Sequence, residues 1–477
     1  MTTLRNARPA WLAILGAAAV AACGGGGSGS NATAGIDRGG VVTSGTITGF
    51  GSVHVNGVRY VTSAAAFVID DQPGSETDLR VGQVVRIEGT LDAGGTTGIA
   101  TRVIFDDEVE GPVQSIDLPN ARLVVLGRTV QVGPSTSFDD SSAPRSLDGV
   151  VVGDRIEVSG FPASDGTVNA TRIERKAAQG SYEIKGTVAS LDTNARRFSL
   201  GALTVSYASA QLSGFASGQP ANGDTVEAAG ALDGSGTLVA SRVEKESESG
   251  GTSDDDADYE GLITRFVSAT DFSVDGQRVT TASATAYEGG TVADLALDVS
   301  VEVEGRFNSA GVIVASKVQF RRSGELEIAA PVDSVNAAAG SLVVLGVTVR
   351  TNSLTRFEDH SAAEVQQFSL ANIAVGDFVE VRAYADGNGY VATLVERDDP
   401  EGGTVELEGT AQSVAAPDFS VNGVAVTTDG NTEFRDNNGE PIGSAAFFLA
   451  AASGQPVKVR GTLVGNVVLA ERAELED

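Results

Sequence analysis

The sequence predicts an all-β protein made of six small barrels in tandem, and three observations lead to this prediction. One segment recurs six times, and its turn position is occupied in order by Gly82, Gly153, Gly223, Asp298, Gly376 and Gly454. Successive turn positions lie 70 to 78 residues apart, a length that suits a small complete domain rather than one unit of a solenoid. Glycine is abundant, with 59 of 477 residues, and no window shows a convincing 3.6-residue helical period.

Each copy opens with a strand-like stretch and continues into a hairpin. The opening stretches begin at Gly45, Gly111, Gly186, Gly261, Ala330 and Gly409. Three copies carry a turn whose two central residues need positive φ, namely Asn56-Gly57, Asp275-Gly276 and Asn422-Gly423. The other three copies have a longer loop followed by Leu126-Gly127, Leu200-Gly201 and Leu345-Gly346. We therefore expect two kinds of repeat on one plan.

The recurring segment contains an alternating strand, which we call the signature strand. Its apolar residues, such as Val85 and Ile87 in the first copy, are expected to face the core. The residues between them are expected to point the other way, and they are Arg86, Glu157, Glu227, Glu302, Glu380 and Lys458. A last strand closes each copy after a Gly-rich turn. One helical turn each is expected near Phe368 and near Ala445, before the signature strand.

About five short strands in each copy favour a closed or nearly closed barrel, because closure removes exposed sheet edges. A five-stranded OB-like barrel is the first prediction, and a small β-sandwich is the alternative. The expected segments are residues 1–22 for a signal peptide, 23–44 for a tether, 45–107, 108–177 and 182–246 for repeats 1 to 3, 247–257 for an acidic linker, and 258–322, 325–398 and 405–477 for repeats 4 to 6.

The N-terminus predicts export and a lipid anchor. Arg5 and Arg8 form a cationic start, and the apolar run from Trp11 to Val20 is shorter than the roughly 20 residues of a bilayer span. The next residues, ending in Ala21-Ala22-Cys23, resemble the lipobox of bacterial lipoproteins. This resemblance implies acylation of Cys23 and cleavage just before it. A plain secretory peptide with an Ala-x-Ala cleavage site is the alternative.

The residues after Cys23 indicate where the anchor is expected to lie. Gly24 stands where an Asp favours retention in the inner membrane of Gram-negative bacteria, so we expect the outer membrane. Residues 24–40 are Gly-rich and predict a flexible tether. No later segment is apolar enough to cross a bilayer. The chain is therefore expected to be exported and lipid-anchored in the bacterial cell envelope.

The repeated motifs resemble the bacterial domain-of-unknown-function 5666 repeat over roughly Gly45 to Glu476. They are a Gly-Thr-Val opening, a Phe-x-Val-x-Gly hairpin, a Val-Gly-Asp-x-Val-Glu-Val-x-Gly signature and an Ala-Thr/Ser-Arg-Val/Ile ending. Members of this family are commonly envelope lipoproteins, so the resemblance implies an OB-like fold, with no established activity and no catalytic residues to carry over. Asp298 replaces the turn Gly, and Arg382-Ala383 replaces the closing Gly, so altered turns are expected there.

The composition excludes several kinds of catalytic site. Met1, Trp11 and Cys23 are the only Met, Trp and Cys, which excludes disulfides, Cys–His zinc sites and Cys nucleophiles from the repeats. His54 and His360 are the only histidines and lie in different repeats, so neither a His-based triad nor a two-His metal site fits one domain. Each is expected to be a solvated or strand-face residue. We predict no catalytic, cofactor-binding or metal-binding residue, and Cys23 as the lipidation site.

Acidic residues follow a phenylalanine at a similar place in four copies. The phenylalanines are Phe67, Phe138, Phe357 and Phe434, and the acids are Asp70-Asp71, Asp139-Asp140, Glu358-Asp359 and Asp436 with Glu440. The favoured interpretation is that the phenylalanine fills the barrel and the acids lie in a solvated turn. Weak calcium coordination by these loop carboxylates is the alternative. The run Asp254-Asp255-Asp256 with Asp258 is expected to keep the linker between repeats 3 and 4 extended.

The function that these features favour is a non-enzymatic, lipid-anchored envelope protein that displays its barrels as a structural or binding scaffold. The alternative is a surface adhesin or ligand-binding module for a glycan or a protein, with or without calcium, and a carboxylate-based hydrolase is the least favoured. Removal of Arg5 and Arg8 with the leader takes the net charge from -30 to -32. Such a charge repels phosphate backbones, so no nucleic acid partner is expected.

Overall fold

The computed structural model describes residues 40–139, 145–246, 251–322, 324, 326–399 and 403–476, and within them the prediction of six barrels is confirmed. Cys23, the predicted signal peptide and most of the predicted tether lie outside the described residues. Among the described residues, no helix has the length and apolar content that crossing a bilayer requires. The strands of the six repeats belong to three sheets, each shared by two repeats.

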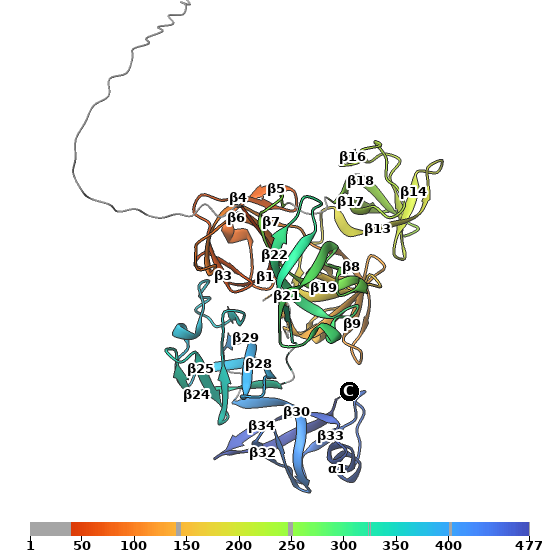
Figure 1. The fold of residues 1–477 in the computed structure, drawn as a ribbon. Coiled ribbons are helices and arrows are strands. Elements are labelled where there is room, and N and C mark those ends of the chain that lie inside the picture. Colours follow the sequence, from red (N-terminus) through yellow and green to blue (C-terminus); the bar gives the residue numbers. More distant parts are fainter. Residues whose placement is uncertain are drawn as a thin grey trace, which may run out of the picture. The chain divides into compact units, whose positions relative to one another are not determined.

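Repeats 1 and 4 share the first sheet (Figure 1). Repeat 1 consists of β1 (Val41–Gly49), β2 (Val53–Val55), β3 (Val58–Val61), β4 (Ala66–Ile69), β5 (Gln72–Gly74), β6 (Val84–Leu91) and β7 (Thr97–Phe105). Repeat 4 consists of β19 (Asp256–Ser268), β20 (Asp271–Val274), β21 (Gln277–Glu288), β22 (Ser300–Phe307) and β23 (Ile313–Phe320). The two repeats are joined by a parallel pairing of β1 with β19.

Repeats 2 and 3 share the second sheet through an antiparallel pairing of their first strands, β8 and β13. Repeat 2 consists of β8 (Val109–Asp117), β9 (Arg122–Val125), β10 (Arg128–Phe138), β11 (Arg155–Pro162) and β12 (Val168–Arg175). Repeat 3 consists of β13 (Tyr182–Asp192), β14 (Arg197–Leu200), β15 (Leu203–Ser206), β16 (Gln211–Ser213), β17 (Thr225–Leu232) and β18 (Leu238–Lys245).

Repeats 5 and 6 share the third sheet, again through their first strands, β24 and β30. Repeat 5 consists of β24 (Leu326–Asn336), β25 (Ser341–Val344), β26 (Val347–Arg350), β27 (Arg356–Asp359), β28 (Phe378–Ala385) and β29 (Tyr390–Asp398). Repeat 6 consists of β30 (Thr404–Ala415), β31 (Asp418–Val421), β32 (Val424–Thr427), β33 (Glu433–Arg435), β34 (Pro456–Val464) and β35 (Val467–Leu475).

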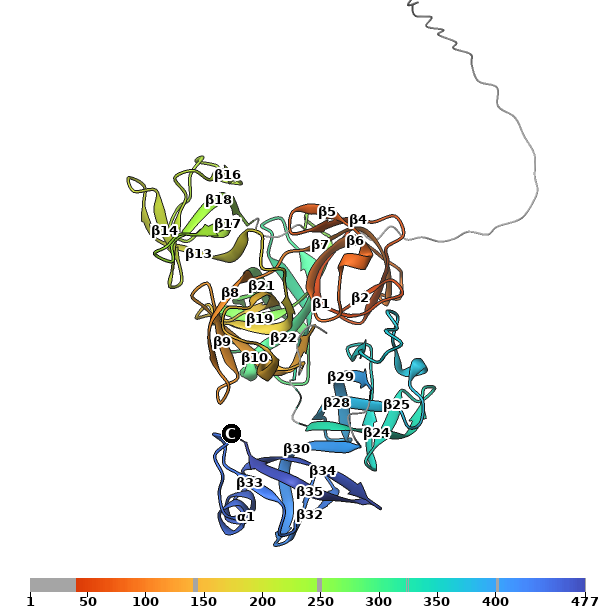
Figure 2. The same cartoon turned by 180° about the vertical axis from the view of Figure 1, so that it is seen from behind.

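The strand pairings of each repeat close a ring of five strands. In repeat 1 the ring runs β1–β2–β3–β7–β6 and returns to β1, and Figure 2 shows these strands encircling the barrel. Only the β3–β7 pair of this ring is parallel. The same ring, with one parallel pair between the third and last strands, recurs in the other repeats. This order confirms the OB-like barrel and removes the small β-sandwich alternative.

A short helical segment precedes the signature strand in five repeats. Four of these segments are 3-10 turns, at Glu76–Asp78, Leu147–Gly149, Val292–Asp294 and Leu370–Asn372. The fifth is the helix α1 (Ser444–Ala452) of repeat 6, which is longer than the single turn expected near Ala445. Its buried residues, Phe447 and Ala451, belong to the hydrophobic core of repeats 5 and 6. The helix is apolar on all sides, and burial of Phe447 and Ala451 in this core fixes it in place.

The signature strands bury both of their faces in repeats 2 to 4. Their apolar residues lie in the barrel cores, as predicted; Val85 and Ile87 are examples. The glutamates between them point away from the core but are also buried, with exposed fractions of 2% for Glu157, 6% for Glu227 and 2% for Glu302. A period of two identifies the two faces of a strand, but it does not report that neighbouring strands and their side chains cover the outer face.

The turns follow the φ values that the sequence predicts. Asn56 and Gly57 have φ of 51° and 79°, and the Asp-Gly and Asn-Gly turns of repeats 4 and 6 are alike. Asp298 was expected to alter its turn, but its φ of 64° keeps the left-handed conformation that Gly82 has at 88°. Asp tolerates this region better than most residues. In repeat 5, the strand register shifts between Arg382 and Ala383. The other repeats shift at their closing Gly in the same way, so the expected alteration at this position is also absent.

Two predicted segment boundaries differ from the structure. The strand β1 begins at Val41, inside the predicted tether 23–44, because Val41 and Val42 are buried in the barrel cores. The strand β19 begins at Asp256, inside the predicted linker 247–257. Asp258 is not part of an extended acidic linker: it is 7% exposed, and its carboxylate accepts a hydrogen bond from Asn56 Nδ2 at 2.9 Å.

Candidate functional site

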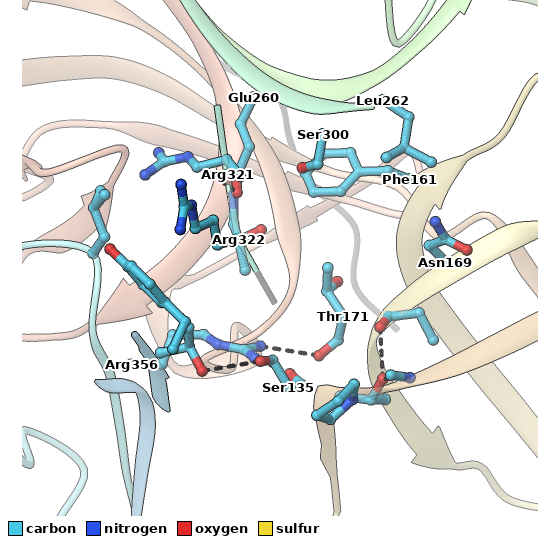
Figure 3. Close-up of a pocket in the computed structure, with 18 of the residues that line it drawn as sticks. Ser135, Phe161, Asn169, Thr171, Glu260, Leu262, Ser300, Arg321, Arg322 and Arg356 are labelled. Carbon is cyan, nitrogen blue, oxygen red and sulfur yellow. Dashed lines mark hydrogen bonds and ion pairs between the residues drawn. The ribbon is translucent and has the colours of Figure 1, made fainter. Parts of the chain in front are cut away.

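A cavity of about 550 Å³ is lined by side chains from repeats 1, 2, 4 and 5. All described residues belong to the same compact unit, residues 37–477. Figure 3 shows the cavity, with Arg321 beside Glu260 and with Arg356 directed toward Ser135 and Thr171. The lining residues used below are Asn56, Phe161, Thr171, Glu260, Asp298, Arg321, Arg322, Arg356 and Tyr384. The volume lies within the range of pockets that bind small molecules.

The barrel plan brings these residues together from chain segments far apart in sequence. Arg321 and Arg322 directly follow β23, the last strand of repeat 4, and Arg356 begins β27 of repeat 5. Phe161 lies in the signature strand β11 of repeat 2, and Tyr384 lies in the signature strand β28 of repeat 5. Each side chain is therefore held by a hydrogen-bonded strand or by the end of one, which restricts its position.

Arg356 is a buried cation whose hydrogen-bond partners are two carbonyl groups and, at 3.4 Å, the hydroxyl of Ser137. It is 6% exposed, and its guanidinium donates to the backbone oxygens of Thr171, at 3.1 Å, and Ser135. No carboxylate lies within ion-pair distance of it among the described residues. Burial lowers the pKa of Arg356, and the nearby charges of Glu358 and Glu396 oppose that shift. The positive charge of Arg356 is therefore only partly compensated.

The other two arginines differ in their partners. Arg321 forms an ion pair with Glu302 at 2.5 Å, and its Nε lies 3.8 Å from Glu260. Arg322 is exposed, and it donates only long hydrogen bonds, at 3.3 and 3.4 Å, to the backbone oxygens of Ala385 and Gly289. In the described part of the chain, Arg322 has no carboxylate partner. The cavity wall thus carries uncompensated positive charge in a chain with a net charge of -30.

The two carboxylates that line the cavity are both engaged. Glu260 Oε2 accepts a hydrogen bond from the backbone N–H of Thr46 at 2.9 Å, and Glu260 Oε1 faces Arg321. Asp298 accepts from the backbone N–H and the hydroxyl of Ser164, at 2.6 and 2.9 Å. A general acid–base pair needs carboxyl groups that are free to exchange protons with a substrate. Both carboxylates are therefore held by contacts within the cavity wall.

Three buried polar atoms in the cavity wall have no hydrogen-bond partner within the described residues. They are Asn56 Oδ1, Thr171 Oγ1 and Arg321 Nε. Buried polar groups are normally satisfied, so such atoms call for a water molecule or a ligand. Asn56 Oδ1 is an acceptor, Arg321 Nε is a donor and the Thr171 hydroxyl can be either, and all three atoms are themselves buried. Phe161 and Tyr384 add apolar faces to the same cavity.

A second feature of the structure is a buried charged network around His360. Glu358 of β27 lies opposite Glu396 of β29, and His360 Nε2 lies 3.5 and 3.4 Å from their carboxylates. Arg172 Nη1 lies 3.2 Å from Glu358 Oε2, and Ser137 donates a hydrogen bond to the same side chain. Burial alone would lower the pKa of His360, but the two carboxylates raise it to about 10. The network is a charge-balanced contact between repeats 2 and 5.

The histidine predictions are therefore partly corrected. His54 lies on β2, on a strand face as predicted, and burial followed by the charge of Arg59 lowers its pKa. His360 is neither solvated nor on a strand face, because it directly follows β27 and two glutamates surround it. Sequence reasoning missed this, since Glu396 lies 36 residues away and faces Glu358 only through the parallel pairing of β27 with β29.

Replacing His360 with glutamine is expected to destabilise the protein strongly at pH 6 and weakly at pH 10. A pKa raised from 6.5 to about 10 contributes stability that is complete below pH 6.5 and is lost as the pH rises through 10. Urea unfolding at the two pH values measures the difference. His54→Gln is the matched control, because the pKa of His54 is lowered rather than raised, so His54 contributes no stability of this kind. Equal destabilisation by His360→Gln at both pH values would contradict the charged pairing.

The phenylalanines that precede the acidic clusters contact the barrel cores, as predicted: Phe138 and Phe434 belong to core clusters, and Phe67 and Phe357 pack against them. The acids do not share one environment, however. They lie in turns, in ion pairs or in the buried network, whereas the prediction placed all of them in solvated turns.

Two of these clusters contain buried carboxylates. Asp359 has a side chain with no exposed area and forms an ion pair with Arg397 at 2.6 Å, which corrects the prediction of a solvated turn at Glu358-Asp359. Burial raises the pKa of Asp70 to about 6, whereas Asp71 is exposed and forms an ion pair with Arg242. The carboxylates of Asp359 and Asp71 therefore already have arginine partners, whereas Asp70 Oδ1 is buried without a hydrogen-bond partner among the described residues.

The remaining clusters are turns, or are only partly described. Asp436 Oδ1 accepts from the backbone N–H groups of Asn438 and Glu440, which is a polar turn of the predicted kind. Asp139 accepts from the backbone N–H of Arg175 at 2.9 Å. Its neighbour Asp140 lies outside the described residues.

The fold and the site together define an all-β protein of tandem OB-like barrels with a polar cavity. A family model for a domain of unknown function, DUF5666, matches residues 39–104, 110–174, 185–244, 260–319, 330–396 and 408–474. These matches cover well over half of the chain, and the protein belongs to the DUF5666 family. A search of curated proteins finds no match.

Proposed function

We propose that this protein is a non-enzymatic, lipid-anchored component of the bacterial cell envelope whose barrels hold a binding site for an acidic glycan. The observation that carries the proposal is the cavity, in which Arg322 and Arg356 have no carboxylate partner among the described residues. An arginine can bind a ligand carboxylate through two parallel hydrogen bonds. Asn56 and Thr171, which line the same cavity, add polar groups that suit a ligand with hydroxyl groups.

The shape of the site favours a glycan over a protein partner. A specific protein interface buries roughly 800 Å² on each side, whereas a cavity of about 550 Å³ holds a ligand of a few sugar rings at most. Phe161 and Tyr384 can pack against the apolar faces of such rings. The engaged carboxylates of Glu260 and Asp298 support binding without hydrolysis. The net charge of -30 argues against a nucleic acid ligand.

A glycan array tests the ligand class. Carboxylated glycans should be retained and their neutral counterparts should not, and Arg322→Gln should lower retention about tenfold. Arg322 is exposed, so this variant is expected to fold. Arg306→Gln is the matched control, because Arg306 is also an exposed arginine of repeat 4 but pairs with Asp256, at 2.9 Å, away from the cavity. Retention of neutral and carboxylated glycans alike would contradict the proposal.

The lipid anchor is tested separately by metabolic labelling with a palmitate analogue. The wild-type protein should be labelled, and Cys23→Ala should lose the label because the only thiol is removed. Ser28→Ala in the Gly-rich segment is the control and should keep it. Labelling that persists in Cys23→Ala would rule out Cys23 as the attachment point and leave the glycan site to be judged on its own test.

A further inference from the structure

Three glutamates lie side by side on neighbouring strands where repeats 2 and 3 meet. Glu110 of β8 is opposite Glu157 of β11 on one side and opposite Glu183 of β13 on the other. Like charges that face each other across a strand pair destabilise it. The negative charge of Glu183 is only weakly compensated. Its arginine partner, Arg242, lies 3.9 Å from Glu183 but 2.5 Å from Glu227, which is the closer partner.

A fourth carboxylate completes a cluster at this place. Asp107, in the segment between β7 and β8, brings one oxygen within 4.8 Å of an oxygen of Glu110 and of Glu157. The exposed fractions are 4% for Asp107, 8% for Glu110 and 2% for Glu157. The three side chains belong to one barrel and to the segment that leads into it, so their proximity follows from the pairing of β8 with β11.

Three cations lie near the cluster, and one of them, the buried Lys185, acts on Asp107 only through its charge. Arg155 Nε lies 2.6 Å from Glu110, and Lys176 Nζ lies 2.5 Å from Glu157. In the described residues, no lysine or arginine lies within ion-pair distance of Asp107. The buried oxygen Asp107 Oδ2 also has no hydrogen-bond partner there. An unsatisfied buried carboxylate oxygen that faces two further carboxylates points to a bound cation.

Repeats 5 and 6 show the same arrangement without the central acid. In the corresponding row, Glu380 of β28 and Glu406 of β30 lie on either side of Ala329 in β24. The junction of two first strands therefore forms without a carboxylate at the central position. Glu110 is not required by the barrel plan, which separates its role from that of a structural residue.

We propose that Asp107, Glu110 and Glu157 bind a calcium ion. Calcium takes carboxylate oxygens at 2.3–2.6 Å, so two oxygens on one ion lie at most about 5 Å apart, a limit that the cluster meets. Asp70 and Glu183 add negative charge near Asp107, so carboxylates outnumber Arg155, Lys176 and Lys185 here and a divalent ion would offset the excess. The site is independent of the glycan cavity, which none of these three residues lines.

The group Glu358, His360 and Glu396 has similar spacing but is not proposed as a cation site. Its glutamates already face a histidine whose pKa is raised to about 10, and Glu358 also faces Arg172, which Glu174 shares. A metal ion would have to displace that proton. The cluster around Asp107 contains oxygen ligands alone, the donor set that calcium prefers.

Isothermal titration with calcium chloride tests the proposal. The protein is first stripped with EDTA and dialysed into a buffer with about 150 mM sodium chloride, which is near physiological ionic strength. The wild-type protein should bind one ion tightly, and Glu110→Ala should bind it at least tenfold more weakly. Ala329 in repeat 5 indicates that alanine is compatible with the fold at this position. Glu406→Gln removes one charge from the equivalent row and should bind as the wild type does.

Asp107→Asn is a second variant that should also lose binding, and circular dichroism verifies that each variant is folded. The proposal is overturned if the wild-type protein binds no calcium, if Glu110→Ala and Asp107→Asn both retain the wild-type affinity, or if Glu406→Gln weakens binding as much as they do. The last outcome would indicate general attraction of calcium to an acidic chain rather than a site.

Discussion

Replacing Phe447 with alanine is expected to lower the free energy of unfolding of the barrel pair formed by repeats 5 and 6 by about 3–5 kcal/mol. Phe447 in α1 has no exposed area, and its ring centroid lies 5.2 Å from that of Phe434 and 5.9 Å from that of Phe419. Both neighbours belong to the same core. Removing the ring loses its transfer free energy and leaves a cavity that rigid strands cannot fill.

Leu449→Ala is the matched control for this prediction. Leu449 lies two residues further along α1 but is 76% exposed, so its loss should change stability by no more than about 0.5 kcal/mol. Thermal unfolding followed by calorimetry should show a shift of about 10 °C for Phe447→Ala in the transition of repeats 5 and 6. Equal small shifts for both variants would mean that α1 does not close this barrel.

Replacing Gly230 with valine is expected to disrupt repeat 3, at a cost of about 3 kcal/mol or more. Gly230 lies at the register shift between β17 and β18, and a Cβ there would be 2.2 Å from the backbone oxygen of Val239. Four other repeats keep a glycine with the same close contact, at Gly89, Gly160, Gly305 and Gly461. Repeat 5 carries Ala383 at its register shift, so Gly230→Ala should be less harmful than Gly230→Val.

Gly234→Val tests whether the effect is local to the close contact. Gly234 lies in the turn after β17, and a Cβ at this position would meet no atom within 4 Å. Its substitution should therefore leave the unfolding of repeat 3 nearly unchanged. Urea titrations of the two valine variants, followed by circular dichroism, compare them directly. Similar midpoints for Gly230→Val and Gly234→Val would contradict the proposed role of the closing glycine.

The barrels could be predicted from the sequence because the information that specifies them is local. Asn56-Gly57 and its counterparts encode positive φ at two successive positions, and Val85 with Ile87 encodes a strand with one core face. The recurrence of these signals six times made the repeats visible without a structure. The resemblance to the DUF5666 repeat is now confirmed by matches in all six copies.

The cavity and the charged clusters could not be predicted because they depend on contacts between distant segments. Arg322 and Arg356 meet Thr171 in one wall only after three barrels have formed. The adjacent basic residues Arg321 and Arg322, in an otherwise acidic chain, were the one weak sequence signal for this cavity. Glu110 and Glu183 are 73 residues apart and become neighbours through the pairing of β8 with β13. The alternation of a strand identifies its outer face but not what covers it.

Direct calorimetric titration of the cavity with a galacturonate trisaccharide tests the central claim, that the barrels hold a site for an acidic glycan. We predict binding at one site per chain, at least tenfold weaker binding of the neutral galactose trisaccharide, and loss of that preference in Arg322→Gln but not in Arg306→Gln. Absence of binding, or equal affinity for the acidic and neutral sugars, would contradict the account.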